Sequence, residues 1–415
     1  MSPRARRLLL WGGSAVVAVA ATGWVMYREI ATFGRAEGIE TGLDFANNTW
    51  RAVRGLFSGV NIYGPTHAVI PGIGPAWPVS QHVPGSLLWQ APFTAFPLSA
   101  ALFTYTFASI LAIWAGVFVL TQPKDPSAVF LSACCGAFAI CIGGGPMTLL
   151  LGQPTGFTLL GLALVVGARQ PWLAGLGFML AASTIQTGLP LALALLALRG
   201  WRVVWRGAVL AFACSLPVMG LEIANAGLPT FVSSFVLGTG AHLVRLNNRI
   251  DLGGLLYRIG GSSTGVQLGI FLVLAPVALI FLARLPPHLR RISHPPVLSF
   301  VVAFVLVVAY HQSYDLLLVG GAVVPAILVN DQSRAMLPAF GLAGTCAGTS
   351  ASIAALFYAP LALLGIGVSS ALALRHTAAS DARAAGDHRL DRHSADATGS
   401  HPPRESADHE NPPAG

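Results

Sequence analysis

A short polar stretch after the first hydrophobic segment carries side chains that can do acid–base chemistry. Asp44, Asn47, Asn48 and Arg51 recur at intervals of three and four residues, so they share one face if residues 44–60 form a helix. A carboxylate on such a face can accept a proton from a substrate hydroxyl. Aspartate is also a favoured N-cap residue, and the spacing alone favours a capping role for Asp44 over a role as general base.

Three further segments place polar side chains between hydrophobic runs. The pair GQ contains Gln153, RLNNRID contains Asn248 and Arg249, and YHQSYD contains His311 and Asp315. An arginine fork binds phosphate, a histidine relays protons or holds an anion, and an acid in a membrane-crossing segment is expected to face a cavity or a partner. Loop solubility explains RLNNRID equally well, and a histidine satisfied at a helix junction is the simpler interpretation of His311.

The composition indicates what kind of scaffold positions these residues. Of the 415 residues, 54% are hydrophobic and only 10% are charged, whereas a soluble domain has about 25% charged residues. Apolar runs of about 18 residues or more recur along the chain, and each can cross a bilayer as a helix. Runs of this length predict helices rather than the strands of a barrel. We therefore expect an all-α polytopic membrane protein.

Basic residues fall in short clusters between the hydrophobic runs, as the positive-inside rule predicts for cytoplasmic loops. This topology accounts for the net charge of +8, so no nucleic-acid partner is expected. It leaves residues 28–84 and 223–264 as two outer loops and places His311 on the same face. Residues 85–120 supply one crossing plus a short or re-entrant helix, and residues 147–167 form one helix. About ten to twelve crossings result, including a retained first helix rather than a cleavable signal peptide.

The chain divides into a membrane domain over residues 1–375 and a tail over residues 376–415. The tail has almost no large apolar side chains, so it is expected to be a disordered cytoplasmic segment. The amphipathic helix predicted within the first outer loop is expected to lie at the membrane interface. Neither the cysteines nor the tail histidines have the spacing of a metal site, and no cofactor is expected. The tail histidines are His376, His388, His393, His401 and His409.

The order of these landmarks resembles that of glycosyltransferase family 87. After the acid of the first outer loop come Gly59, Asn61 and Tyr63, then a proline-bearing entry to the membrane at Pro84, and then LLLGQPTGF, LNNRIDLGGLLYRIGG and YHQSYDLLLV. The resemblance covers most of residues 1–375. It implies a GT-C-like bundle of transmembrane helices that acts as a multi-pass enzyme of the cell membrane, with its active site on the outer face.

The reaction that the resemblance implies moves a sugar, typically mannose, from a polyprenyl-phosphate donor to a lipid or glycan acceptor, with inversion. By that analogy Asp44 is the catalytic general base and His311 is a second catalytic residue. The leaving group is a lipid phosphate, so the protein mainly positions the reactants and stabilises charge, without a metal. The residues expected to bind substrate are Asn48, Arg51, Tyr63, Gln153, Asn248, Arg249 and Asp315.

Two other functions stay open at this point. A transporter or flippase of lipid-linked sugars is expected to show internal repeats or charged residues at the bilayer midplane, and the sequence displays neither clearly. A catalytically lapsed family member is the other alternative. Many members carry a Lys-Pro pair near the paired helices, whereas this chain reads STIQT over residues 183–187 and has no lysine there.

Overall fold

The computed structural model describes residues 1–33, 42–64, 69–70, 73–75, 82–142, 144–241, 251–260, 264–309, 313–329 and 359–380. In chain order the elements are α1 Pro3–Phe33, α2 Leu43–Phe45, the π-helical η1 Ala46–Arg51, α3 Ala52–Phe57, β1 Val69–Ile70, β2 Gly74–Pro75, α4 Pro84–Gln90, the 3-10 helix η2 Ala91–Ala95, α5 Leu98–Thr121, α6 Pro126–Cys141, α7 Gly145–Leu151, α8 Thr155–Gly167, α9 Pro171–Ala181, α10 Ile185–Ala197, α11 Trp201–Ala226, α12 Leu228–Ala241, α13 Leu252–Gly260, α14 Thr264–Arg284, α15 Pro295–Val308, the 3-10 helix η3 Ser313–Leu316, the π-helical η4 Val319–Val323 and α16 Val324–Val329. A last helix spans Ala359–Ser380.

Helices dominate the described part of the chain, which confirms the all-α polytopic architecture. Among the residues that the structure describes, four helices are long and apolar enough to cross a membrane, namely α1, α5, α11 and Ala359–Ser380. The pair of α6 and α7, bent by 52° at its break, counts as a fifth if it forms one span. Several shorter apolar helices of 10–17 residues pack among them. The number of ten to twelve crossings stays a prediction.

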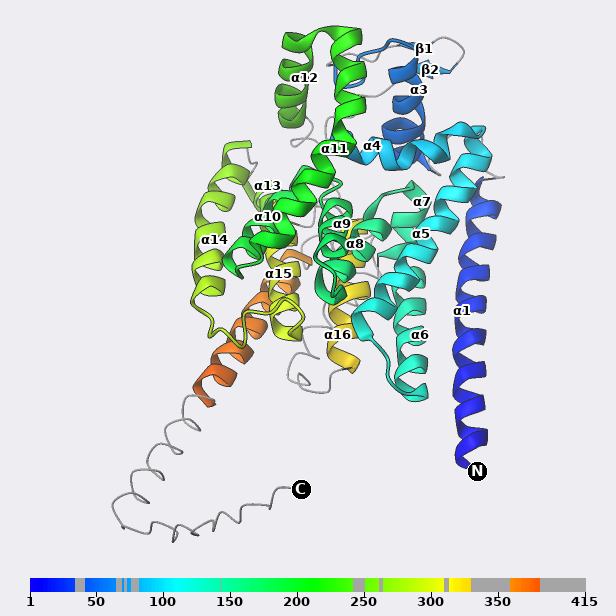
Figure 1. Cartoon of the computed structure of the whole chain (residues 1–415), viewed down its shortest axis with the longest axis vertical. Helices are drawn as coiled ribbons and strands as arrows, with labels where there is room; N and C mark the ends of the chain where they lie inside the picture. Colours follow the sequence, from blue (N-terminus) through cyan, green and yellow to red (C-terminus); the bar gives the residue numbers. More distant parts are fainter. Residues whose placement is uncertain are drawn as a thin grey trace, which may run out of the picture.

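The two predicted outer loops share one end of the molecule. In Figure 1, α1 runs from the N-terminus to the opposite end, where α3, β1, β2 and α12 lie. We call this the loop end. Backbone contacts bring further segments there: His82 forms a β-bridge with Thr184, and the backbone N–H of Ile62 donates to Glu222 of α11 at 3.0 Å. The helix Ala359–Ser380 runs toward the end that holds the N-terminus (Figure 1).

Small residues allow the helices of the bundle to approach closely. A Cβ added to Gly161 of α8 would lie 2.5 Å from the carbonyl oxygen of Gly177 of α9. A Cβ added to Gly207 of α11 would lie 2.8 Å from the carbonyl oxygen of Gly175 on the other side of α9. Close backbone packing of this kind is how helices associate in lipid, where burial of apolar area contributes little. These contacts set α8, α9 and α11 side by side.

The expected helix over residues 147–167 is interrupted, which corrects the sequence-based prediction. Residues Gly152–Pro154 separate α7 from α8, and Gly152 has a φ of 70°. A left-handed backbone suits glycine, and Pro154 disfavours a helical conformation for the residue before it. By contrast, the prediction for residues 85–120 is confirmed, because α4 and η2 form a short helical segment ahead of the long α5.

The predicted helix of the first outer loop is present as α2, η1 and α3. Ala52, Val53 and Leu56 are buried in a cluster that includes Val218 of α11. Phe57 at the end of α3 is 71% exposed. The helix therefore packs against the bundle through one apolar face. Its predicted place at the membrane interface stays a prediction.

The last helix ends later than expected. Helix Ala359–Ser380 continues five residues past position 375, where the tail was expected to begin, and residues 381–415 lie outside the described part. The second outer loop contains two helices, α12 and α13.

Candidate functional site

Asp44 lies inside the first turn of α2, so the capping interpretation favoured by its spacing is wrong. The N-cap position belongs to Gly42, with a φ of 70°, and no side chain caps this helix. The carboxylate of Asp44 turns instead toward the break between α7 and α8. There its Oδ2 accepts a hydrogen bond from Nε2 of Gln153.

Burial raises the pKa of the Asp44 carboxyl to about 6, while the hydrogen bond from Gln153 acts in the opposite direction. Desolvation disfavours the charged form of an acid, and a donor aimed at the carboxylate favours it. A pKa just below neutrality suits a general base, because the group is ionised at pH 7 yet accepts a proton more readily than an ordinary aspartate.

The break after α7 joins Asp44 to a second acid. Thr155, the first residue of α8, donates from Oγ1 to Oδ1 of Asp315 on η3 at 3.1 Å. Gln153 and Thr155 are separated by one proline, so a single turn holds one acid on each side. We call residues Gly152–Thr155 the bridging turn. Asp315 is half-buried.

Close contacts hold the bridging turn in place. The backbone N–H of Gly42 donates to the carbonyl of Leu150 at 2.6 Å, and the N–H of Gln153 donates to the carbonyl of Thr148 at 2.9 Å. A Cβ added to Gly152 would lie 2.5 Å from the Cβ of Phe45. Any other residue at position 152 would force α2 away from the turn.

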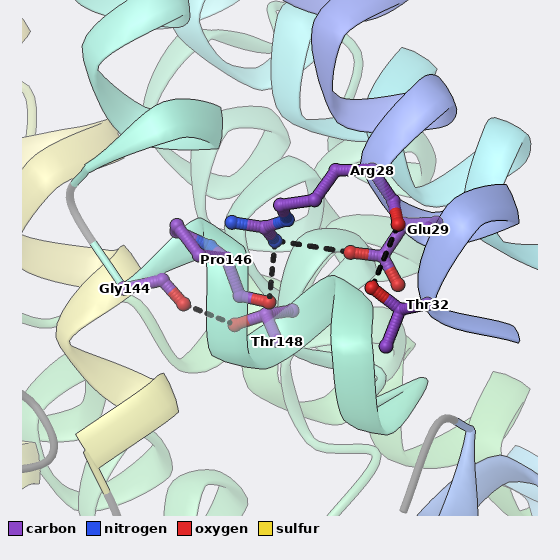
Figure 2. A network of polar contacts seen from close by, with 6 residues as sticks. All are labelled: Arg28, Glu29, Thr32, Gly144, Pro146 and Thr148. Carbon is purple, nitrogen blue, oxygen red and sulfur yellow. Dashed lines mark hydrogen bonds and ion pairs between the residues drawn. The ribbon is translucent and has the colours of Figure 1, made fainter. Parts of the chain in front are cut away.

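The start of α7 is anchored to the C-terminal end of α1, as Figure 2 shows. Nη2 of Arg28 donates to Oε1 of Glu29 at 3.0 Å and to the carbonyl oxygen of Pro146 at 3.3 Å. Gly144, with a φ of 85°, lies so close to η3 that an added Cβ would be 2.5 Å from the backbone nitrogen of Leu317. Both ends of α7 are therefore held, and the bridging turn follows directly from its second end.

The helix formed by α2, η1 and α3 has the predicted polar face, and some side chains on this face form hydrogen bonds with one another. Nη1 of Arg51 donates to Oδ1 of Asn47 at 2.7 Å, which confirms that these two residues share a face. The Nε of Arg51 is buried without a partner. Asn48 is half-buried beside them. Arg51 thus supplies a cation on the helix that carries Asp44.

Beneath this helix lies a buried polar group that the sequence did not single out. Oε1 of Gln90 accepts hydrogen bonds from Oγ1 of Thr49 at 2.9 Å and from the hydroxyl of Tyr105 at 3.4 Å. The ring of Tyr105 in turn packs against Phe45 with centroids 4.4 Å apart. These contacts brace the residue next to Asp44. Thr49 and Gln90 carry no sequence signal beyond being polar within apolar surroundings.

Tyr63 lies apart from the contacts that join Asp44, Gln153 and Asp315, and its expected role as a substrate contact stays a prediction. Its side chain is fully buried, and its hydroxyl donates to the carbonyl of His82 at 3.3 Å. Its ring packs edge-on against Phe231 and Phe235 of α12. Burial raises the pKa of Tyr63 and, secondarily, so does the nearby Glu222. Tyr63 joins the first outer loop to α12.

Three predicted site residues, Asn248, Arg249 and His311, lie outside the described residues. Their neighbour Asp251 is fully buried, and its Oδ1 accepts from the backbone N–H of Gly254 at the start of α13. Among the residues that the structure describes, no three His, Cys, Asp or Glu side chains are grouped so that they could hold a metal ion.

Comparison with known proteins gives one match. The family model described as glycosyltransferase family 87 matches residues 82–329, more than half of the chain. The matched range contains Gln153, Thr155 and Asp315, and it begins after Asp44. Comparisons with curated proteins and with solved structures found no match.

Proposed function

The chain belongs to glycosyltransferase family 87 and is a membrane glycosyltransferase, and from this premise we propose that it transfers a sugar, mannose by preference, from a polyprenyl-phosphate donor to a hydroxyl of a lipid or glycan acceptor. We place the reaction on the outer face of the cell membrane. The grouping of α2, the bridging turn and η3 supports one reaction centre built from segments far apart in the sequence.

Asp44 is the general base in this proposal. The acceptor oxygen forms a bond to the anomeric carbon while the bond from that carbon to the phosphate oxygen breaks. The electron pair of the broken bond leaves with the lipid phosphate, and the hydroxyl proton passes to Asp44. Attack opposite the leaving group inverts the anomeric centre. A positioned base of this kind contributes roughly 10²- to 10⁴-fold in rate.

Cationic and amide side chains bind the donor in this proposal. Arg51, Arg249 and His311 are the side chains that we assign to phosphate binding. The negative charge of the phosphate grows as it leaves, and stabilising that charge lowers the barrier. Asn48 and Asn248 bind sugar hydroxyls through their amides. Asp315, held by Thr155, takes part in acceptor binding. The observation that carries the proposal is the half-buried Asp44 carboxylate, oriented by Gln153, with its pKa raised to about 6.

The test is Asp44→Asn in a transfer assay with polyprenyl-phosphate-mannose and membrane acceptor lipid. Asparagine keeps the size of the side chain and can still accept a hydrogen bond from Gln153, but it cannot take the proton at neutral pH. Transfer is expected to fall roughly 10²- to 10⁴-fold.

The matched control is Asp125→Asn, because Asp125 is an exposed N-cap of α6 that accepts from the backbone N–H groups of Ser127 and Ala128. Asparagine caps a helix about as well as aspartate, so transfer should stay at the wild-type level. Near-normal transfer by a folded Asp44→Asn variant would overturn the proposed role of Asp44 and show that another group accepts the hydroxyl proton.

A further inference from the structure

We propose that Gln153 is a positioning residue, whose side-chain amide holds one oxygen of the Asp44 carboxylate so that the other oxygen faces the acceptor hydroxyl. The inference rests on the proposed function, because it concerns the orientation of the proposed base. It replaces the expectation that Gln153 binds substrate.

The geometry distinguishes holding the base from contacting the substrate. Nε2 of Gln153 donates to Oδ2 of Asp44, and Gln153 is only 8% exposed. Within the described part of the chain, this is the one hydrogen bond that the Asp44 carboxylate receives from a side chain, so Oδ1 is left for a substrate. An amide buried this deeply is directed into the protein rather than toward a ligand.

Gln153 can orient Asp44 because its own backbone is held on both sides. Its N–H donates to the carbonyl of Thr148 at 2.9 Å, and Pro154 follows it with a restricted φ. Beyond the proline, Thr155 donates to Asp315 at 3.1 Å. On the preceding side, Gly152 packs against Phe45, the neighbour of Asp44, with no room for a side chain. Because the backbone around Gln153 is fixed in this way, its side-chain amide can hold the Asp44 carboxylate in a defined orientation.

Within the described part of the chain, the hydrogen bonds and ring contacts of the other charged and titratable groups around Asp44 do not involve its carboxylate. Arg28 and Glu29 pair with each other at the start of α7, and Arg51 bonds to Asn47. The ring of Tyr105 packs on Phe45, and Asp315 bonds to Thr155. The pKa of Asp44 is raised by burial and lowered by the Gln153 hydrogen bond alone. Removing that donor should therefore move the pKa of Asp44 further upward.

The experiment measures transfer against pH for the full-length protein with Gln153→Leu and with Gln153→Glu. Leucine fills the site without a donor, so kcat should fall roughly 10- to 100-fold through misorientation of the base. The acid limb of the pH profile should move to higher pH, while KM stays within about twofold. Glutamate has the shape of glutamine but adds a second carboxylate, and two carboxylates that share a proton raise one pKa strongly. The acid limb should then lie highest in Gln153→Glu.

Asn225→Leu is the matched control, since Asn225 is a half-buried amide on α11 that donates to the carbonyl of Leu56 at 2.9 Å rather than to Asp44. It should lower the melting temperature in detergent without moving the acid limb. A rise in KM with an unmoved acid limb in both Gln153 variants would return Gln153 to substrate binding. If the Gln153 variants melt at a lower temperature but keep the wild-type acid limb of the pH profile, Gln153 only stabilises the fold.

The two proposals fail in different ways. If Asp44→Asn transfers normally, the proposed function of Asp44 is wrong whatever the Gln153 variants do. If Asp44→Asn abolishes transfer but Gln153→Leu and Gln153→Glu keep the wild-type acid limb, only the positioning role is overturned.

Discussion

Asp44 and Asp315 lie on opposite sides of one turn, where Gln153 donates to the first and Thr155 donates to the second at 3.1 Å. The two acids come from α2 and η3, which are far apart in the sequence. The bridging turn therefore couples the first outer loop to the C-terminal half of the bundle. Only Pro154 separates the two donors Gln153 and Thr155, so this one turn contacts both acids of the proposed site.

The wild-type protein should lose transfer activity in acid with a midpoint near pH 6, because Asp44 must be ionised to accept a proton and its pKa is raised to about 6. The measurement is kcat/KM from pH 4.5 to 8 on detergent-solubilised protein, with a melting curve at each pH as the control for unfolding. If kcat/KM instead falls with a midpoint near pH 4, the value typical of an exposed aspartate, a general base with a pKa raised by burial would be contradicted.

Asp44→Asn should stabilise the fold at neutral pH even as it removes activity. The folded-state pKa of Asp44 is about 6, above its ordinary value of 3.8. Above pH 6 the buried charge therefore costs the folded state at most about 3 kcal/mol. This cost is lost as the pH falls from about 6 to below 4, where Asp44 is protonated in both states. In detergent, the melting temperature of the variant should be higher than that of the wild type at pH 7.5. At pH 4 the two melting temperatures should differ little.

Replacement of Glu222 by glutamine should preserve the stability of the fold, whereas replacement by leucine should lower it. It is fully buried on α11, and its Oε1 accepts from the backbone N–H of Ile62 at 3.0 Å. Glu222→Gln keeps that acceptor, so the free energy of unfolding should change little. Glu222→Leu leaves a buried N–H unpaired and should cost roughly 1–3 kcal/mol. Equal melting temperatures for the two variants would mean that the contact with Ile62 does not hold the first outer loop.

The loop end should be reached from outside the cell. Ser58 is exposed there, next to α3, whereas Ser127 is exposed at the start of α6 beside the basic Lys124. An impermeant thiol reagent should label Ser58→Cys in intact cells and Ser127→Cys only after permeabilisation, with the wild type as the control for native cysteines. The reverse pattern would place the proposed site in the cytoplasm and exclude an outer-face reaction.

Removal of residues 381–415 should leave membrane insertion and transfer close to wild type. This segment has almost no large apolar side chains, so it cannot contribute a buried core. The cut follows Ser380, where the last described helix ends. A truncated protein that inserts at the normal level but loses transfer would show that the tail acts on the reaction.

The class of the protein and its helical architecture were predictable from the sequence alone. Low charge, long apolar runs and clustered basic residues are properties that any bilayer-spanning chain must have, so they can be read without knowing which helices touch. The shared face of Asn47 and Arg51 was predictable for the same reason, since helical periodicity is local.

Only the tertiary structure decided what Asp44 and Tyr63 touch. Local spacing favoured a helix cap for Asp44, and the family resemblance implied a substrate contact for Tyr63. The approach of α7 instead gives Asp44 a partner, and the approach of α12 buries Tyr63. The break at Gly152 depends on the same approach, because its left-handed backbone and missing side chain serve the contact with Phe45. Hydrogen bonds and burial between distant segments depend on packing in space, and a periodic pattern along one segment carries no information about that packing.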